Sequence, residues 1–345
     1  MSDVVHGGLS DAERDALRAA GVEVVDLSAN LHPDGPPPEV LDALRAVEVA
    51  RYPSADGAPL REALAARHGI APECVVMTPG AAAAIYLATA ALLRPGDRCA
   101  VFTPTFGEYV PAVEAAGGEV VRVTASPPDT PPPTPPSGVA LAVLCNPDNP
   151  TGRYLDRDAV RSLAAAGPHL FVDAAYEPLA EGRWAATDLV REGAQISVVH
   201  SLTKLFAMPG VRLGYAVASP EVAREMARRQ PPWPLGAHAV AAGLAALEVM
   251  DDRLATVTAV HARRRRLDEA LAALGLTVIP SRANFVLADV GDATAFRAAL
   301  LTEGFAVRDA TSFGLPGHVR IAVPAEAHLD RLLAALPPAL AASPG

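Results

Sequence analysis

The hydrophobic pattern from residue 75 to residue 218 alternates between short apolar runs and amphipathic or alanine-rich segments. The apolar runs are typical of buried strands, and the segments between them predict helices, such as 81–93 and 110–116. This alternation predicts an α/β fold, in which helices cover a mainly parallel sheet. The predicted strands are 75–77, 98–102, 119–123, 139–144, 170–173, 198–201 and 213–218.

The two ends of the chain follow other patterns. Near the N-terminus we predict an amphipathic segment over 10–20, a strand over 22–27, an irregular proline-rich stretch, and helices over 39–46 and 59–68. Near the C-terminus a helical region over 236–274 precedes an α+β pattern, with strands at 277–279, 284–288, 306–308 and 319–323 and helices at 293–303 and 326–336. We therefore predict three parts: an arm with part of the small domain (1–48), a large α/β domain (49–235) and a small C-terminal domain (236–345). The proline-rich segment 127–136 predicts a rigid surface connection, with a polyproline docking site as the alternative.

Composition and charge limit the function classes. The 345 residues are 50% hydrophobic and 20% charged with a net charge of −10, which is typical of a globular protein and argues against nucleic acid as the main partner. The one basic run, Arg263 to Arg266, is expected to be the solvated face of a helix. Cys74, Cys99 and Cys145 lack the spacing of a disulfide framework or a metal site, so no metal is predicted. Without an apolar run of membrane or signal type, we predict a cytoplasmic protein with no membrane partner.

Lys204 is the most distinctive candidate for chemistry. It follows a β-branched run at 196–199, with Ser201 and Thr203 just before it and Arg212 after it. An amine that leaves a buried strand among hydroxyls and a cation is suited to attack an aldehyde, and pyridoxal phosphate is the commonest carbonyl cofactor that needs such a lysine. An ordinary surface lysine is the alternative interpretation of this residue alone.

Two loops follow predicted strands. The loop 78–82 holds Gly80 beside small residues at a strand-to-helix turn, where backbone N–H groups can bind a phosphate, although such turns are often only structural. The loop 146–152 has the sequence Asn-Pro-Asp-Asn-Pro-Thr-Gly and lies at the carboxyl end of a strand, where ligands of parallel sheets bind. An asparagine there could donate to a phenolate oxygen, or it could simply form a turn.

Three more residues carry candidate roles. Asp173 ends a buried strand, where a carboxylate is costly unless a cation such as a protonated pyridine nitrogen pairs with it. A helix-capping aspartate is the alternative. Tyr176 follows three residues later, and Phe106 offers either an aromatic face for a planar ring or a residue for the core.

In this order, these motifs resemble the class I/II aminotransferase family of fold type I over nearly the whole chain. The resemblance implies a large domain with a mainly parallel sheet between helices, a smaller α+β domain, and pyridoxal 5′-phosphate as cofactor. It implies that Lys204 holds the cofactor covalently and moves protons, and that Asp173 pairs with the pyridine nitrogen. Tyr176 and Asn149 match the residues that bind the cofactor O3′, and Phe106 matches the aromatic residue that stacks on the ring.

The same resemblance implies further contacts. Arg320 matches the arginine that binds the substrate α-carboxylate, and Tyr52 matches a tyrosine that reaches the cofactor phosphate across a homodimer interface. The phosphate cup matches Gly80, Ala81, Ala82, Ser201, Thr203 and Arg212. Relatives often have hydroxyl or acidic residues where this chain has the two alanines, so phosphate binding is expected to depend on backbone N–H groups.

Two reactions of this family are the nearest candidates. His6-Gly7-Gly8 and the segment 28–33 are similar to L-threonine O-3-phosphate decarboxylase of cobalamin biosynthesis, a lyase that makes (R)-1-amino-2-propanol O-2-phosphate, so we predict this reaction first. His6, Asn30 and Asn149 would then help to hold the substrate. The alternative is histidinol-phosphate aminotransferase, or another amino-acid transaminase that uses 2-oxoglutarate. A cofactor-binding sensor without turnover is a third interpretation, which the absence of a basic patch disfavours.

Overall fold

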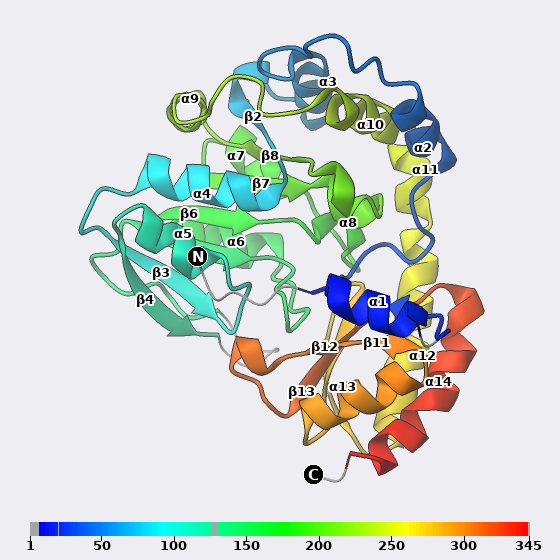
Figure 1. Ribbon diagram of the computed structural model, residues 1–345. Coiled ribbons are helices and arrows are strands. Elements are labelled where there is room, and N and C mark those ends of the chain that lie inside the picture. Colours follow the sequence, from blue (N-terminus) through cyan, green and yellow to red (C-terminus); the bar gives the residue numbers. More distant parts are fainter. Residues whose placement is uncertain (1–6, 20, 126–129, 131, 344–345) are drawn as a thin grey trace.

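The computed structural model describes residues 7–19, 21–125, 130 and 132–343. The chain forms two lobes (Figure 1), and the larger one is built on a seven-stranded sheet with the order β2-β8-β7-β6-β5-β3-β4. The strands agree with the predicted ranges within about two residues at each end. They are β2 (Val75–Thr78), β3 (Arg98–Thr103), β4 (Glu119–Thr124), β5 (Leu141–Cys145), β6 (His169–Asp173), β7 (Ile196–Ser201) and β8 (Gly214–Val217).

The sheet is mainly parallel, as predicted. Strands β4, β3, β5, β6 and β7 all run in one direction, whereas β8 is antiparallel to both of its neighbours, β7 and β2. A parallel neighbour would need a connection that crosses back over the sheet. Residues 202–213 instead return directly from the end of β7 to the adjacent β8, a reversal that the apolar pattern alone did not indicate.

Helices cover both faces of this sheet. On one face lie α4 (Ala81–Leu92), α5 (Tyr109–Ala115) and α9 (Pro220–Ala227), and on the other lie α6 (Arg157–Ala164) and α7 (Thr187–Arg191). The helices α6 and α9 were not predicted, although each begins at a capping residue. The Asp156 carboxylate accepts from the Ala159 amide at 2.8 Å, and the Ser219 hydroxyl accepts from the Val222 amide at 3.4 Å.

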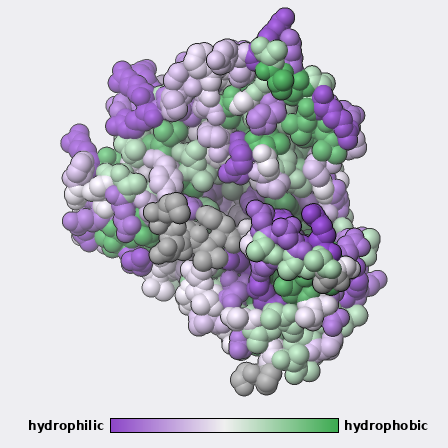
Figure 2. All heavy atoms as spheres, viewed as in Figure 1, coloured by the Kyte–Doolittle hydropathy of each residue, from purple (hydrophilic) through white to green (hydrophobic). Residues whose placement is uncertain are grey.

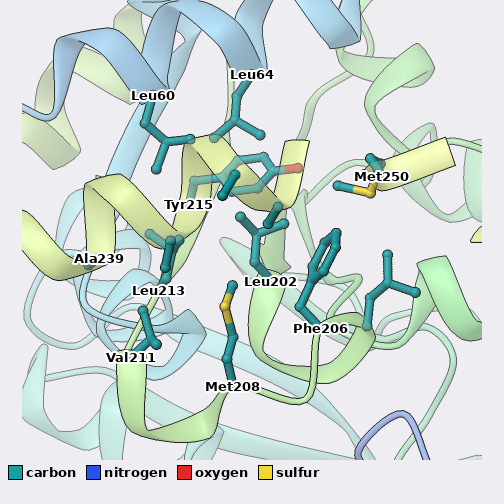
Figure 3. Packing of buried hydrophobic residues seen from close by; sticks show 14 of the residues in the cluster. Leu60, Leu64, Leu202, Phe206, Met208, Val211, Leu213, Tyr215, Ala239 and Met250 are labelled. Atoms are coloured by element: carbon teal, nitrogen blue, oxygen red, sulfur yellow. The ribbon is translucent and has the colours of Figure 1, made fainter. Parts of the chain in front are cut away.

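A third apolar cluster fixes the segment that follows Lys204. Helices α2 (Pro38–Arg45), α3 (Ala58–His68) and α10 (Ala237–Glu248) pack around it. Figure 3 shows Leu60 and Leu64 of α3 pointing toward Tyr215, with Leu202, Phe206 and Met208 on the other side of that ring. The short helix α8 (Leu202–Leu205), which carries Lys204, is therefore anchored in a packed core.

The smaller lobe contains an antiparallel sheet of order β12-β13-β10-β9, which packs with α13, α14 and the end of α12 (Val257–Ala273). Its elements are β9 (Thr277–Ile279), β10 (Phe285–Asp289), α13 (Ala293–Thr302), β12 (Arg308–Asp309), β13 (His318–Ala322) and α14 (Glu326–Ala341). The N-terminal arm joins this lobe, because β1 (Val25–Asp26) pairs in parallel with β11 (Phe305–Ala306). Helix α1 (Asp11–Ala19) lies beside the lobe (Figure 1), where the Glu13 carboxylate binds Arg297 at 2.5 Å. Residues 11–19 and 25–26 therefore lie beside the C-terminal lobe.

The predicted helical region 236–274 consists of three helices, α10, α11 (Met250–Ala255) and α12 (Val257–Ala273). Helix α12 runs from the larger lobe into the smaller one (Figure 1). The expectation that Arg263 to Arg266 form a solvated face holds for Arg265 and Arg266, which are exposed. It was wrong for Arg263 and Arg264, which are buried at the junction of the lobes. All four arginines are ion-paired, and their partners are Asp34, Glu181, Asp268, Glu326 and Asp330.

The predicted division of the chain at residues 48 and 235 stays a prediction. One apolar core contains α2, α3 and α10, and each of these helices comes from a different predicted part. Over the described part of the chain, no helix combines the length and apolar character needed to cross a membrane. On the face shown in Figure 2, hydrophilic residues are prominent over α1 and α9, with apolar residues between such groups. Of the predicted connection 127–136, residues 127–129 and 131 lie outside the described residues, as does His6.

Candidate active site

A cavity of about 1130 Å³ lies at the carboxyl ends of β5, β6 and β7 and extends to the smaller lobe. The carboxyl ends of parallel strands meet at one edge of a sheet, which explains why loops that are distant in the sequence converge here. Most of the predicted site residues form the wall of this cavity. They are Gly80, Ala81, Ala82, Phe106, Asn149, Asp173, Tyr176, Ser201, Thr203, Lys204, Arg212 and Arg320.

Lys204 brings its amine into this cavity from α8. The Ser201 hydroxyl caps the helix by accepting from the Thr203 amide at 3.2 Å, which fixes the turn that presents the lysine. Its Nζ donates to the Ala29 carbonyl at 3.0 Å and lies 5.5 Å from the centre of the Tyr176 ring. Composition carries a further signal, since Lys204 is the only lysine in the sequence. The chain therefore offers a single ε-amine, and that amine faces the cavity.

Asp173 is buried at the end of β6, and among the residues that the structure describes no cation donates a hydrogen bond to it. Its two oxygens accept from the Tyr109 hydroxyl at 2.8 Å and from the Ala175 amide at 3.0 Å. Burial raises the pKa of Asp173, while the Ala175 amide, the Tyr109 hydroxyl and the charge of Lys204 oppose this rise. A protonated ring nitrogen would suit this carboxylate. Tyr109, which the sequence analysis did not single out, is fully buried and orients it.

The N-terminus of α4 forms another part of the wall. Gly80 has φ +89°, and a Cβ there would lie 2.7 Å from Nη2 of Arg212, so glycine lets the guanidinium approach the turn. At Gly214 on β8, a Cβ would lie 2.7 Å from the first amide nitrogen of α4. The first N–H groups of a helix lack intrahelical acceptors and carry partial positive charge. Together with Arg212 they suit a phosphate.

Phe106 and Asn149 lie on two loops that one half-buried carboxylate, that of Asp148, joins. Asp148 accepts from the Thr105 hydroxyl at 2.8 Å and from the Thr151 hydroxyl at 2.6 Å. Burial raises the pKa of Asp148 to about 6, and both hydroxyls oppose that rise. Asp148 therefore fixes the aromatic loop relative to the asparagine loop, a role that the sequence analysis missed.

Two arginines mark the opposite end of the cavity. Arg320 of β13 is buried, donates to the Ser28 carbonyl at 2.5 Å and also donates to Oδ1 of Asn149. Burial lowers the pKa of Arg320 to about 10, which leaves it charged at neutral pH. Arg308 of β12 also lines the cavity, and its Nη2 donates to the Ser312 hydroxyl at 2.7 Å. Two cations here suit a substrate with anionic groups.

Other predicted residues lie elsewhere. Asn30 is fully buried outside the cavity wall of the described residues, and its Nδ2 donates to the Tyr176 hydroxyl at 3.4 Å. Tyr52 is 85% exposed, with its ring centre 5.1 Å from that of Trp233. His6 lies outside the described residues. Where side chains are described, no three His, Cys, Asp or Glu residues gather as a metal ion would require.

Comparison with known proteins defines the class. Residues 22–336 match the family described as aminotransferase class I and II. The chain is 34% identical over 337 residues to histidinol-phosphate aminotransferase of Symbiobacterium thermophilum, which covers 94% of this chain and 93% of that protein. The chain therefore belongs to the class I and II aminotransferase family, and its cofactor is pyridoxal 5′-phosphate.

Solved structures agree with this assignment. L-threonine-O-3-phosphate decarboxylase from Porphyromonas gingivalis superimposes with a TM-score of 0.81 at 26% identity, covering 90% of this chain and 97% of that one. Histidinol-phosphate aminotransferase from Sinorhizobium meliloti in complex with pyridoxal-5′-phosphate has a TM-score of 0.84 at 24% identity, covering 97% and 96%. The fold type I architecture predicted from the sequence is confirmed.

Proposed function

We propose that this enzyme is an aminotransferase that exchanges an amino group between a phosphorylated amine of the histidinol phosphate type and a 2-oxo acid. The observation that carries the proposal is the 34% identity, over nearly the full length of both chains, to a protein named histidinol-phosphate aminotransferase. The sequence analysis placed the decarboxylase first. The relatives favour the opposite order. The identity to the histidinol-phosphate aminotransferase of Symbiobacterium thermophilum is 34%, whereas the identity to the decarboxylase structure is 26%.

The proposed cofactor contacts follow the cavity wall. Asp173 keeps the ring nitrogen protonated, Asn149 and Tyr176 bind O3′, and Phe106 stacks on the ring. The phosphate is held by Gly80, Ala81, Ala82, Ser201, Thr203 and Arg212. When bound, pyridoxal phosphate withdraws electrons from the substrate Cα, which weakens the bonds to that carbon.

The chain itself supplies binding and proton transfer. The Lys204 amine is the proposed general base that removes the Cα proton and returns it, and its contact with Ala29 holds it on the Tyr176 side of the cavity. Arg320 binds the carboxylate of the 2-oxo acid or amino acid, and Arg308 binds the distal anionic group. Burial of Arg320 shields such contacts from water and makes them stronger than at the surface.

Decarboxylation of phosphothreonine is the second candidate. The Gly8 amide donates to the Ser28 hydroxyl at 2.7 Å, and Gly7 lines the cavity, so the glycines of the His6-Gly7-Gly8 motif adjoin the Arg320 contact. In this reaction the bond from Cα to the carboxylate breaks, CO2 leaves, and Cα receives a proton. A substrate with a carboxylate and a phosphate would also use both arginines.

The two reactions differ in their products. Purified enzyme with pyridoxal phosphate is incubated with histidinol phosphate and 2-oxoglutarate, and separately with phosphothreonine alone. We expect glutamate to form in the first mixture and no CO2 to leave the second. CO2 release from phosphothreonine, with no glutamate from the first mixture, would reverse the assignment, and Lys204→Ala is the control that should abolish either reaction.

We also propose a cytoplasmic homodimer in which Tyr52 contacts the cofactor phosphate of the partner subunit. The support is that Tyr52, Trp233 and Val49 are large apolar side chains exposed on the surface. Mixing Tyr52→Ala and Lys204→Ala proteins tests whether Tyr52 contributes to the site of the partner subunit. If Tyr52 serves the partner, a hybrid dimer contains one intact site and the mixture regains activity; two variants that stay inactive together, despite forming dimers, would disprove it.

A further inference from the structure

Asn30 occupies a strained and fully enclosed position next to the proposed O3′ contact. Its φ is +52°, in the left-handed region that few residues other than glycine and asparagine tolerate, and its side chain is fully buried. The flanking residues Ser28 and Ala29 offer their carbonyls to Arg320 and Lys204. Asn30 alone in this run directs its side chain to Tyr176.

A second buried asparagine fixes the backbone at this point. Nδ2 of Asn284, which lies just before β10, donates to the carbonyls of Asn30 at 3.1 Å and Leu31 at 3.2 Å. One residue further on, the His32 amide donates to the Lys204 carbonyl at 2.9 Å. The strained turn is therefore held from both lobes, and strain that the surroundings maintain in this way is typical of functional sites.

In the hydrogen bond between Asn30 and Tyr176, Asn30 is the donor and the Tyr176 oxygen is the acceptor. An amide nitrogen can only donate, so the Tyr176 oxygen accepts from Asn30 with one lone pair, and its own proton is not used in that bond. The Tyr176 ring is held edge-on by Phe285, with ring centres 5.3 Å apart, and the residue lines the cavity. The phenolic proton can therefore point into the cavity, where an O3′ phenolate would accept it.

We infer that Asn30 is a positioning residue, anchored by Asn284, that directs the Tyr176 hydroxyl proton to the cofactor O3′. This inference rests on the proposed role of Tyr176 and replaces the earlier expectation that Asn30 contacts the substrate. The contact at 3.4 Å is long, as active-site hydrogen bonds often are before the ligand binds, so its effect should be that of one modest hydrogen bond.

Asn30→Gly is the sharpest variant, because glycine keeps the left-handed backbone and removes only the side chain. Two readouts are measured on the purified protein: the dissociation constant for pyridoxal phosphate, and the pH midpoint of the visible absorbance of the bound cofactor. We expect Asn30→Gly to weaken cofactor binding by roughly 3- to 10-fold and to shift the midpoint in the same direction as Tyr176→Phe. In the Tyr176→Phe background, Asn30→Gly should change neither quantity further.

The double variant separates the outcomes. An Asn30→Gly protein with wild-type affinity and midpoint, or one whose effect persists unchanged in the Tyr176→Phe background, would overturn the inference but leave the role of Tyr176 intact. If Tyr176→Phe itself changes neither readout, the proposed role of Tyr176 fails and the inference fails with it. Asn30→Asp, which keeps the volume and backbone preference but offers only acceptors, answers the same question if the glycine variant does not fold: we expect the same direction of shift, and no shift would overturn the inference.

Discussion

The cavity has two walls of different construction. The sheet wall, from Gly80 to Arg212, comes from one sheet edge and the N-terminus of α4. The arm wall combines Ser28 and Ala29 of the N-terminal arm with Arg308 and Arg320 of the C-terminal lobe, which meet through the β1–β11 pairing and the Arg320–Ser28 hydrogen bond. In our account the first wall holds the cofactor and the second selects the substrate. Changes in the sheet wall should therefore affect every substrate, and changes in the arm wall only some.

The largest expected effect is in the sheet wall. Replacing Asp173 with Asn removes the charge that we propose keeps the ring nitrogen protonated, so kcat should fall by about 10²- to 10³-fold for every substrate. Steady-state kinetics with two amino donors measures this. Tyr109→Phe removes only one hydrogen bond from the same carboxylate and serves as the matched control, with a loss of about tenfold or less. A loss confined to one donor would contradict the division between the walls.

In the arm wall, truncating Arg320 should act on substrate binding. Because a buried charged contact is lost, we expect kcat/KM for the 2-oxo acid to fall by roughly 30- to 1000-fold in Arg320→Ala, while affinity for pyridoxal phosphate stays within about threefold of wild type. Arg308→Ala is the companion variant, and it should discriminate between substrates with and without a distal anion. Loss of cofactor binding in Arg320→Ala would show that the walls are not independent.

A smaller effect is expected where Asp148 joins the two cofactor loops. Because the pKa of this carboxyl is raised to about 6, it loses its charge as the pH falls through that value and then accepts more weakly from Thr105 and Thr151. Cofactor affinity of the wild type should fall several-fold across this range. Asp148→Asn should have low affinity that does not change between pH 5 and 7, as measured by absorbance titration; a variant that keeps the wild-type pH profile would refute this role.

The smallest expected effects concern the stability of the fold, and two histidines, one in the arm and one at the end of α3, allow a comparison. Burial lowers the pKa of His32 in the arm and of His68 behind the sheet to about 4 in each case. The folded state then binds fewer protons than the unfolded chain, so the free energy of unfolding is highest above pH about 6.5 and falls as the pH drops toward 4. Each histidine should contribute on the order of 1–3 kcal/mol to that loss. In His32→Asn and His68→Asn, the free energy of unfolding measured in urea should depend less steeply on pH than in wild type. An unchanged pH dependence in one variant would show that its histidine does not contribute to the loss of stability.

The sheet wall could be predicted from sequence because each of its residues lies in a short motif next to a strand end. Lys204, Asp173 and Gly80 needed only local patterns and the rule that carboxyl ends converge. The sole lysine in the composition would have strengthened that prediction.

Residues whose role depends on a distant partner could not be found in this way. From the sequence, Tyr109 is an ordinary core aromatic residue, and only the structure shows that its hydroxyl donates to Asp173. Asn30 is likewise a turn residue in the sequence, whereas the structure shows its contacts with Tyr176 and Asn284. Arg263 and Arg264 were misjudged for the same reason, since their burial follows from the meeting of the two lobes. Local sequence shows which side chains can ionise or donate, whereas tertiary packing decides which partners they find.

The central claim, that the sheet wall holds pyridoxal phosphate through Lys204, can be tested by trapping the cofactor. Protein loaded with pyridoxal phosphate is reduced with borohydride, digested and mapped by mass spectrometry. Because the chain has a single lysine, the account predicts one cofactor adduct, on the peptide that contains Lys204, and none on that peptide in Lys204→Arg. An adduct found only on the N-terminal amine, or no adduct in a folded protein at saturating cofactor, would contradict it.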